Sequence, residues 1–402
     1  MSTAETTVTT ELLDQWATGP NSPVALHLKQ RLLPVEGEGG VIFPPTYADI
    51  GYNIDTLSDG TKVATIDSVG SQANRMEPMF KSSKNEKGEE LNPLAALVPQ
   101  IEIILNVKEK DGEKYERRQS LLDLAHRSAD AVVKATPELR KFIDPAFVAL
   151  NRHGNAWPLC AVAPTSLLFG VWDSRDGTGE KRPRLVRSVI RAWDVDVLHG
   201  AAQFNSVWKA LSEEDQNLLK EEEKKKGKVK RSVAGLADAP SSFRPDTKAP
   251  HFLNGAPNPE ARVLGGVLVK GLIERTVTIN LVALRALHGG NETETTQIRK
   301  YLLRLALLTA TAELDLFLRE GCFLRYADTE DVWMQVPRRG DPSPIDVPAH
   351  NTLLELATDA VKPFMEKWPE GKDGKPALEY EFNIREAKDL LSKKVEDEAE
   401  AL

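Results

Sequence analysis

The chain has 402 residues, with 52 lysines and arginines against 60 aspartates and glutamates, so its formal charge is −8. Apolar residues make up 41% of the chain and charged residues 28%, a composition typical of a globular protein and not of a disordered one. The acidic balance excludes a protein that coats nucleic acid through its overall charge, so any polyanionic partner has to meet a local basic patch.

The cysteines and the least polar stretch exclude further classes. Cys160 and Cys322 lie too far apart for a CxxC metal site, and two cysteines do not make a disulfide scaffold. The first residues lack the basic and apolar regions of a secretion signal. Residues 154–172 carry no formal charge, but Pro158, Pro164 and several amides and hydroxyls would leave polar groups unpaired in lipid. We therefore expect a soluble, cytoplasmic protein with no membrane partner.

Hydrophobic periodicity predicts a mixture of strands and helices. Alternation over residues 24–33 indicates a strand with one apolar and one basic face. Further strands are predicted at residues 63–66, 101–107, 166–172, 185–197, 263–269, 276–281 and 322–326. Helices are predicted at residues 121–132, 204–219, 298–316, 353–364 and 385–402, with Pro137 ending the first and Gly321 capping the third. Without internal repeats, this order predicts a single α+β unit with long insertions.

The chain lacks the motifs of common catalytic sites. Its seven histidines form no HxH or HExxH spacing and no Cys/His pattern that would hold zinc. The sequence also contains no GxxxxGK[ST] phosphate loop and no GxSxG nucleophile motif. The sequence therefore predicts no metal and no cofactor.

Basic residues gather in the region predicted as a long hairpin, whose strands are 166–172 and 185–197. Residues 175–191 contain six cations and two carboxylates. Arg187, Arg191 and Trp193 fall on one side of the second strand. Guanidinium groups bind phosphate and an indole stacks on a base, which suits a polyanion. A solvated hairpin edge that resists edge pairing explains the same pattern. The lysine-rich run 224–231 follows three glutamates and is interpreted as a solvated helix end. The proline-rich loop 237–259 suits a strand-clamping loop as well as an ordinary linker.

The densest cluster of hydrogen-bonding side chains follows the strand at residues 63–66. It consists of Ser68, Ser71, Gln72, Asn74 and Arg75. If a helix opens here, its free N–H groups and dipole attract an anion, and Arg75 would complete a phosphate seat. An N-cap with solvent-facing neighbours is the alternative interpretation.

The residues around this cluster resemble a known family. Residues 67–77 read DSVGSQANRME and resemble the signature DSxxSQxNRxE of a CRISPR-associated family, the backbone subunit of type I-G (formerly type I-U) Cascade complexes. These subunits are Cas-seven-type members of the RAMP superfamily. Residues 43–48, 122–131 and 164–174 fit the same family, and the matches run from about residue 32 to residue 193.

The resemblance implies an α+β fold with a modified RRM-like (ferredoxin-like) palm, inserted finger helices and a thumb-like β-hairpin or loop. It places palm and hairpin elements at about residues 24–200 and 262–336, a variable insertion at about 204–260, and C-terminal helices with a charged tail at 352–402. Either the basic hairpin or the loop 240–259 supplies the thumb.

The resemblance also implies a function. The chain would be a non-catalytic subunit that polymerises along one CRISPR RNA as a helical filament and supports pairing of the guide with target DNA. Its partners would be CRISPR RNA, target DNA, other copies of itself and the other effector subunits. The residues expected to contact RNA are Ser68, Ser71, Gln72, Asn74, Arg75, His126, Arg127, Arg182, Arg184, Arg187 and Arg191.

Two other functions stay open. Backbone subunits of the related type III complexes cleave target RNA with an aspartate, so the chain is alternatively a metal-dependent endoribonuclease that uses Asp67, with Asp173 as a second candidate. The competing interpretation of Asp67 is an acceptor of backbone hydrogen bonds at a helix start. A generic interaction scaffold that binds no nucleic acid is the third possibility.

Overall fold

The fold is described from a computed structural model of the whole chain. The described residues are 5–47, 50–108, 114–173, 180–200, 207–226, 234, 236, 252–253, 256–257, 263–328, 331–369 and 377–390. The chain forms a mixed α+β fold with several sheets, as the sequence predicts. The expected loop at 237–259 lies almost entirely outside the described residues, and so does the part of the expected helix 385–402 that follows residue 390. The described residues 385–390 are helical, as predicted.

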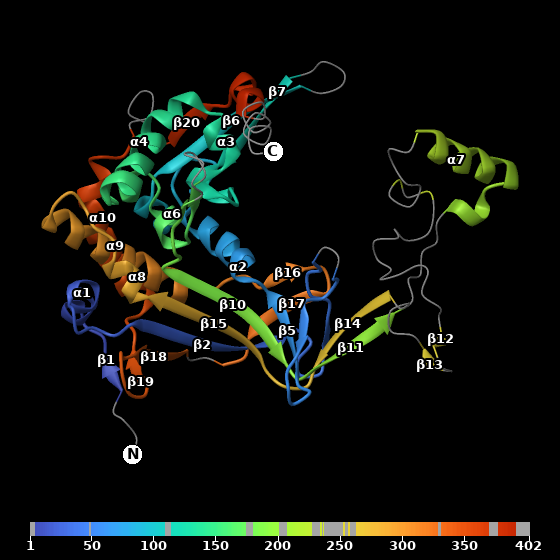
Figure 1. Cartoon of the computed structure of the whole chain (residues 1–402), viewed down its shortest axis with the longest axis horizontal. Coiled ribbons are helices and arrows are strands. Elements are labelled where there is room, and N and C mark those ends of the chain that lie inside the picture. The colour runs from blue at the N-terminus through green and yellow to red at the C-terminus, as the bar shows by residue number, and fades with distance from the viewer. Residues whose placement is uncertain are drawn as a thin grey trace, which may run out of the picture.

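A ten-stranded sheet forms the centre of the fold (Figure 1). Along it the strands follow the order β1-β19-β18-β2-β15-β10-β5-β4, and the β16–β17 hairpin joins β2. Their bounds are β1 Thr6–Thr7, β2 Ala25–Pro34, β4 Ile54–Thr56, β5 Lys62–Asp67, β10 Val186–Trp193, β15 Ile273–Asn280, β16 Phe317–Arg319, β17 Cys322–Tyr326, β18 Val332–Val336 and β19 Ser343–Asp346. Each of the pairs β18–β2, β2–β15 and β15–β10 is antiparallel. Numbered by their order in the chain, the four central strands therefore follow the spatial order 4-1-3-2.

The alternation in the sequence decides which side chains the sheet buries. On β2, Leu26, Leu28, Gln30 and Leu32 are buried, whereas Lys29 and Arg31 between them are exposed. Because successive strand residues point to opposite faces, the apolar half of β2 lies under the helices and the basic half faces away from them. The prediction of a strand with an apolar and a basic face is confirmed.

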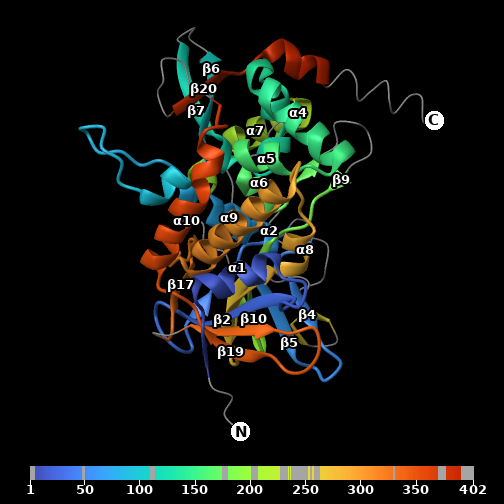
Figure 2. The same cartoon turned by 90° about the vertical axis from the view of Figure 1, so that its left-hand side faces the viewer.

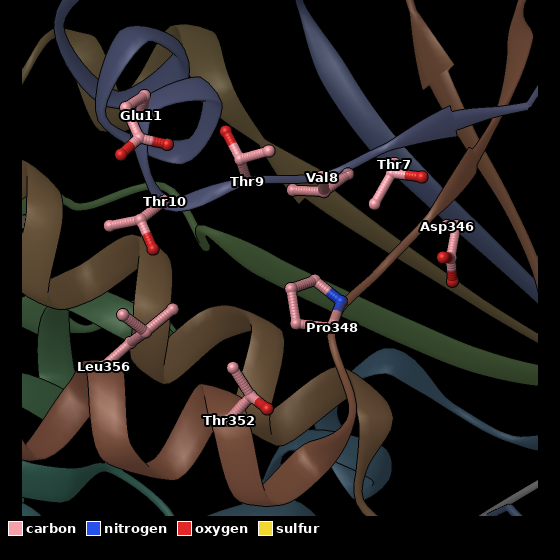
Figure 3. A pocket seen from close by; sticks show the side chains of 9 residues that line it. All are labelled: Thr7, Val8, Thr9, Thr10, Glu11, Asp346, Pro348, Thr352 and Leu356. Carbon is pink, nitrogen blue, oxygen red and sulfur yellow. The ribbon is translucent and has the colours of Figure 1, made fainter.

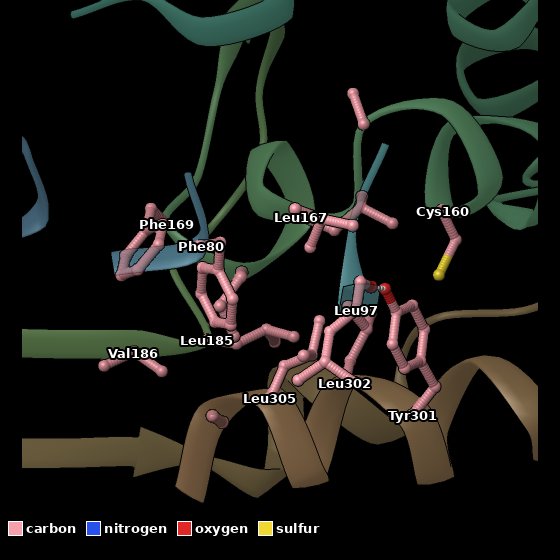
Figure 4. Close-up of a cluster of buried hydrophobic side chains, with 14 of the residues drawn as sticks. Phe80, Leu97, Cys160, Leu167, Phe169, Leu185, Val186, Tyr301, Leu302 and Leu305 are labelled. Carbon is pink, nitrogen blue, oxygen red and sulfur yellow. Dashed lines mark hydrogen bonds between the residues drawn. The ribbon is translucent and has the colours of Figure 1, made fainter. Parts of the chain in front are cut away.

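Helices pack on one face of this sheet. These are α1 (Thr10–Thr18), α2 (Val69–Met76), α6 (Pro164–Leu168), α8 (Leu281–Arg285) and α9 (Glu292–Thr311), and both views place them on the same side (Figures 1 and 2). Helix α9 is the central packing element, since most of its second half is buried. Its Leu302 and Leu305 meet Phe80, Leu97 and Leu185 in the main core, and the Tyr301 hydroxyl donates to the Leu97 carbonyl (Figure 4).

Smaller elements surround this core. Helices α3 (Ala131–Lys134), α4 (Pro137–His153), α5 (Trp157–Val162) and α10 (His350–Met365) extend the helical layer. Strands β6 (Gln100–Lys108), β7 (Lys114–Ser120) and β20 (Ala377–Glu381) form a second sheet. Strands β3 (Val41–Ile42), β11 (Val195–Gly200) and β14 (Val263–Val269) form a third. The remaining elements are α7 (Glu213–Lys226) and the short pairs β8 (Trp172–Asp173) with β9 (Glu180–Lys181), and β12 (Phe252–Leu253) with β13 (Ala256–Pro257).

The hairpin expected from residues 166–172 and 185–197 is only partly formed. Residues 164–168 are helix α6, and the first arm is reduced to β8, which pairs with β9 and not with β10. Pro164 at the start of α6 explains the difference, because proline is pre-organised for the first helical turn and short apolar runs do not separate strand from helix. The second arm is correct but bends at Asp194 into β10 and β11.

The helix predicted over residues 121–132 is also wrong. The segment consists of 3₁₀ turns at Leu121–Asp123 and Arg127–Ala129, followed by the short helix α3. Local capping causes the break, because the Asp130 side chain accepts from the Val132 N–H and Arg127 has a positive φ of 52°. Pro137 opens helix α4 as well as ending the previous pattern.

Two helix boundaries also differ from the prediction. Helix α9 ends at Thr311, and Gly321, with a φ of 77°, forms the turn between β16 and β17 and caps no helix. In the region 204–219 the helix α7 starts at Glu213, because the Ser212 hydroxyl accepts from the Asp215 N–H and caps it.

Candidate nucleic-acid interface

The signature segment forms the end of β5 and the whole of α2. Ser68 is the N-cap of α2, and its Oγ accepts from the Ser71 N–H at 3.2 Å and lies 3.1 Å from the Ser71 Oγ. Both serines are half-buried. A helix therefore opens here with a serine as its N-cap, the role that the alternative interpretation gave it, and the two hydroxyls hydrogen-bond within its first turn.

Gln72 is part of a buried hydrogen-bonding network. Its side chain is fully buried, and its amide nitrogen donates to Asp67 Oδ2 at 2.7 Å. Its Oε1 accepts from Ser188 Oγ at 2.7 Å and from Arg275 Nε at 3.2 Å. The expected RNA contact of Gln72 is therefore not available in this structure, where its polar atoms join α2 to the sheet.

Arg275 is the residue of this network that the sequence interpretation missed. It is fully buried, and its Nη1 donates to Gln30 Oε1 at 2.5 Å. Gln30 in turn donates to Asp331 Oδ1 at 2.8 Å, so the network runs from α2 across three strands. The sequence signal that could have found it is its position. Arg275 is a charged residue on the otherwise apolar side of the alternating strand around residues 276–281.

Arg75 lies between a carboxylate and a backbone carbonyl. Its Nε is 3.0 Å from Asp67 Oδ2, and its Nη2 donates to the Leu318 carbonyl at 2.9 Å. One third of the Arg75 side chain is exposed, whereas that of Asp67 is buried. Burial raises the pKa of the Asp67 carboxyl, and the hydrogen bonds from Gln72 and Arg75 oppose that rise. Asp67 accepts from side chains and not, as the alternative interpretation held, from the helix backbone.

Arg127 is buried, so its expected RNA contact is not available in this structure. Its Nε lies 2.7 Å from Glu77 Oε2, and its Nη1 donates to the Gly170 carbonyl at 3.2 Å. Its guanidinium also lies 5.3 Å from the centre of the Phe169 ring. Burial lowers the pKa of Arg127, and the positive charge of Arg184 lowers it further. Arg127 therefore holds three segments together.

Around this buried arginine lie exposed polar and basic side chains. Asn74 is exposed, and its Oδ1 accepts from Arg127 Nη2 at 3.4 Å. His126 and Arg184 are exposed, and the stem of Arg184 lies against Gly170. We call Asn74, Arg75, His126 and Arg184 the signature surface. The structure thus brings together segments that are far apart in the chain.

The remaining predicted arginines lie elsewhere. Arg182 is half-buried and donates to Asn151 Oδ1 at 2.5 Å. Arg187 and Arg191 are on β10, where Ser188 between them points to Gln72 and the helical side. Because neighbouring strand residues alternate, Arg187 and Arg191 face the opposite side of the sheet from α2. The predicted contact residues therefore divide between two faces of the sheet.

Pockets near the N-terminal strand do not suit a polyanion. One of about 360 Å³ lies between the start of α1, β19 and α10 and carries Glu11 and Asp346 (Figure 3). A neighbouring one of about 870 Å³ carries Glu5, Glu313 and Asp331 among its lining residues. Their negative charge repels phosphate groups. Within the described ranges, no group of three or more His, Cys, Asp or Glu residues is arranged to hold a metal ion, and no helix is long and apolar enough to span a membrane.

Comparisons with known proteins place part of the chain in a family context. Residues 26–197 match the model of the family described as CRISPR-associated protein GSU0053. Over these residues the match bears out the resemblance to a CRISPR-associated family that the signature predicts. No curated protein matches the chain. A solved structure described as "CRISPR RNA-guided surveillance complex, pre-nicking" is 10% identical and covers 89% of this chain and 95% of its own, with a TM-score of 0.28.

Proposed function

We propose that the chain is a non-catalytic, CRISPR RNA-binding backbone subunit of a type I effector complex in the cytoplasm. Copies of it would assemble along one guide RNA, together with the other effector subunits, and leave the guide free to pair with target DNA. The observation that carries this proposal is the match of residues 26–197 to a CRISPR-associated family, since this range contains the whole signature surface.

The geometry of the signature surface supports an RNA-backbone contact. The guanidinium groups of Arg75 and Arg184 and the imidazole of His126 can donate hydrogen bonds, and Asn74 adds an amide. Of these, Asn74, His126 and Arg184 are exposed to solvent. Donors held on a buried frame suit sugar and phosphate groups, which are the same at every position of a guide.

The strand order supports an RRM-like palm. The central strands β2, β10, β15 and β18 lie in the spatial order β18-β2-β15-β10, all antiparallel. This 4-1-3-2 order, with helix α2 before the second strand and helix α9 before the fourth, is that of a ferredoxin-like unit. Strands β10 and β15 continue into the ribbon of β11 and β14, which leaves the sheet (Figure 1). We assign the thumb-like element to this ribbon.

The proposal is tested by purifying the full chain from its native host and extracting its nucleic acid. We expect RNA of one defined length and a particle that contains several copies of the chain. The double variant Asn74→Ala/Arg184→Ala should retain less RNA. The slope of log affinity against log salt concentration should become shallower by about 0.7 for each lost phosphate contact. The matched control for this variant is Arg117→Ala, which removes an exposed cation from strand β7.

The outcomes separate the function from the site. A native protein free of RNA would contradict the proposed function and favour an interaction scaffold. A native protein that carries guide RNA, while the double variant retains as much RNA as the wild type, would contradict only the signature surface.

A further inference from the structure

The face of the central sheet that points away from the helices carries a row of cations. In the strand register Arg191 pairs with Glu274, and Glu274 pairs with Arg31, so these three side chains share one face. Lys29 lies two residues from Arg31 on β2, and Arg187 lies four residues from Arg191 on β10, so both side chains point to this same face. We call this side of the sheet the open face. No described helix covers it in either view of the fold (Figures 1 and 2).

Charge on the open face is predominantly positive although the whole chain is acidic. Strands β2, β10, β15 and β18 are described completely, and Glu274 is the one carboxylate among their residues. Against it stand Lys29, Arg31, Arg187 and Arg191. Arg31 pairs with Glu38 at 2.8 Å, whereas within the described part of the chain Lys29 and Arg187 form no ion pair.

Exposed aromatic rings continue the open face at one end. The Val35 N–H donates to the Phe323 carbonyl at 3.1 Å and Arg325 pairs with Leu33, so Phe323 and Arg325 extend the sheet next to β2. Phe323 is 47% exposed and lies edge-on to Phe317, which is 52% exposed, with the ring centres 5.7 Å apart. On β10, Trp193 follows Arg191 on the same face and is 38% exposed. Adjoining exposed rings such as Phe317 and Phe323 form an apolar patch, and such patches are typical of interaction sites.

We propose that the open face binds a single strand of nucleic acid, with phosphates on Lys29 and Arg187 and a base stacked on Phe323. This inference rests on the proposed function and adds a second contact surface to it, on the opposite side of the sheet from the signature surface. Flat cationic surfaces bordered by aromatic rings suit single strands, because every base has a face that stacks and every nucleotide has a phosphate. Because like charges repel, the excess of cations over carboxylates disfavours the open face of another copy as the occupant.

The test measures binding of a labelled, mixed-sequence single-stranded RNA to the full chain across a salt series. We expect Lys29→Ala/Arg187→Ala to lower affinity at least about tenfold and to reduce the salt slope by about 1.4, for two lost phosphate contacts. Phe323→Ala should lower affinity about fivefold or more without changing the slope, because stacking carries no charge. Matched controls are Arg117→Ala/Lys141→Ala for the cations and Phe142→Ala, whose ring is 42% exposed, for the aromatic ring.

Each result decides the inference. Binding by the open-face variants that equals that of the wild type would overturn it, and so would a wild-type chain that binds no RNA. A double variant that loses association between copies at unchanged RNA affinity would show a protein interface and would also overturn it. Because guide RNA in the natively purified protein is measured separately, the inference can fail while the proposed function stands.

Discussion

The carboxylate of Glu77 lies 2.7 Å from the guanidinium of Arg127, and both side chains are almost completely buried. Glu77 is the last residue of the signature, whereas Arg127 belongs to a second matching stretch about fifty residues later. Their pairing therefore joins two motifs in space. A buried charge whose partner is removed is left uncompensated, so this pair is expected to matter for folding before it matters for binding.

Arg127→Ala should lower the free energy of unfolding by about 3–5 kcal/mol, because it leaves the Glu77 carboxylate buried without its counter-charge. Urea denaturation followed by circular dichroism measures this change. The exposed neighbour Arg184→Ala is the control and should stay within about 0.5 kcal/mol of the wild type. An Arg127→Ala protein of unchanged stability that has lost RNA would contradict the structural role.

The pH dependence of the free energy of unfolding should reflect the titration of the Glu77 carboxyl. Burial raises the pKa of its carboxyl from the ordinary 4.5 to about 7, although Arg127 opposes the rise. The folded protein then holds a proton that the unfolded chain has lost, so this group's contribution is complete below about pH 4.5 and disappears as the pH rises through about 7. Glu77→Gln does not titrate, so the stability of the wild type should fall relative to this variant across that window. If the free energies of unfolding of the wild type and of Glu77→Gln changed in the same way with pH, the result would contradict the assignment.

Gln72→Ala should destabilise the fold without a direct effect on RNA contacts. The change leaves Asp67 with one hydrogen bond fewer and removes one acceptor that Ser188 and Arg275 share. Buried polar groups that lose their partners cost about 1–3 kcal/mol, so we expect a loss of about 2 kcal/mol or more in chemical denaturation. If stability were unchanged and RNA affinity fell, Gln72 would have to face the ligand.

The assembled complex should not cleave RNA at Asp67. This carboxylate is buried and accepts from Gln72 and Arg75, which leaves it poorly placed to bind a metal or activate water. Incubation with complementary labelled RNA and Mg²⁺ should therefore leave the RNA intact. Regularly spaced cuts that disappear in Asp67→Ala would establish the endoribonuclease instead. The side chain of the second candidate, Asp173, lies outside the described residues.

Strands were predicted from the sequence more reliably than short helices. The alternation at residues 24–33 and the long apolar stripe at 298–316 correspond to β2 and α9, because burial of one face imposes a period on the sequence. The segment 121–132 has helical spacing but folds as separate turns, because the Asp130 cap and the positive φ of Arg127 override the periodicity. Local capping and packing, which no periodicity records, decided these elements.

By itself the sequence determined the mixed α+β class, the strand with a basic face and the resemblance to a CRISPR-associated family. These properties reside in residues that are close together in the chain. Only the tertiary structure decided that Gln72 and Arg127 are buried while Asn74 and Arg184 are exposed. It also decided that Arg187 and Arg191 face away from α2, because the two faces of a sheet separate residues that are adjacent in sequence. Exposure depends on which distant segment packs on a side chain, and the spacing of residues along the chain does not contain that information.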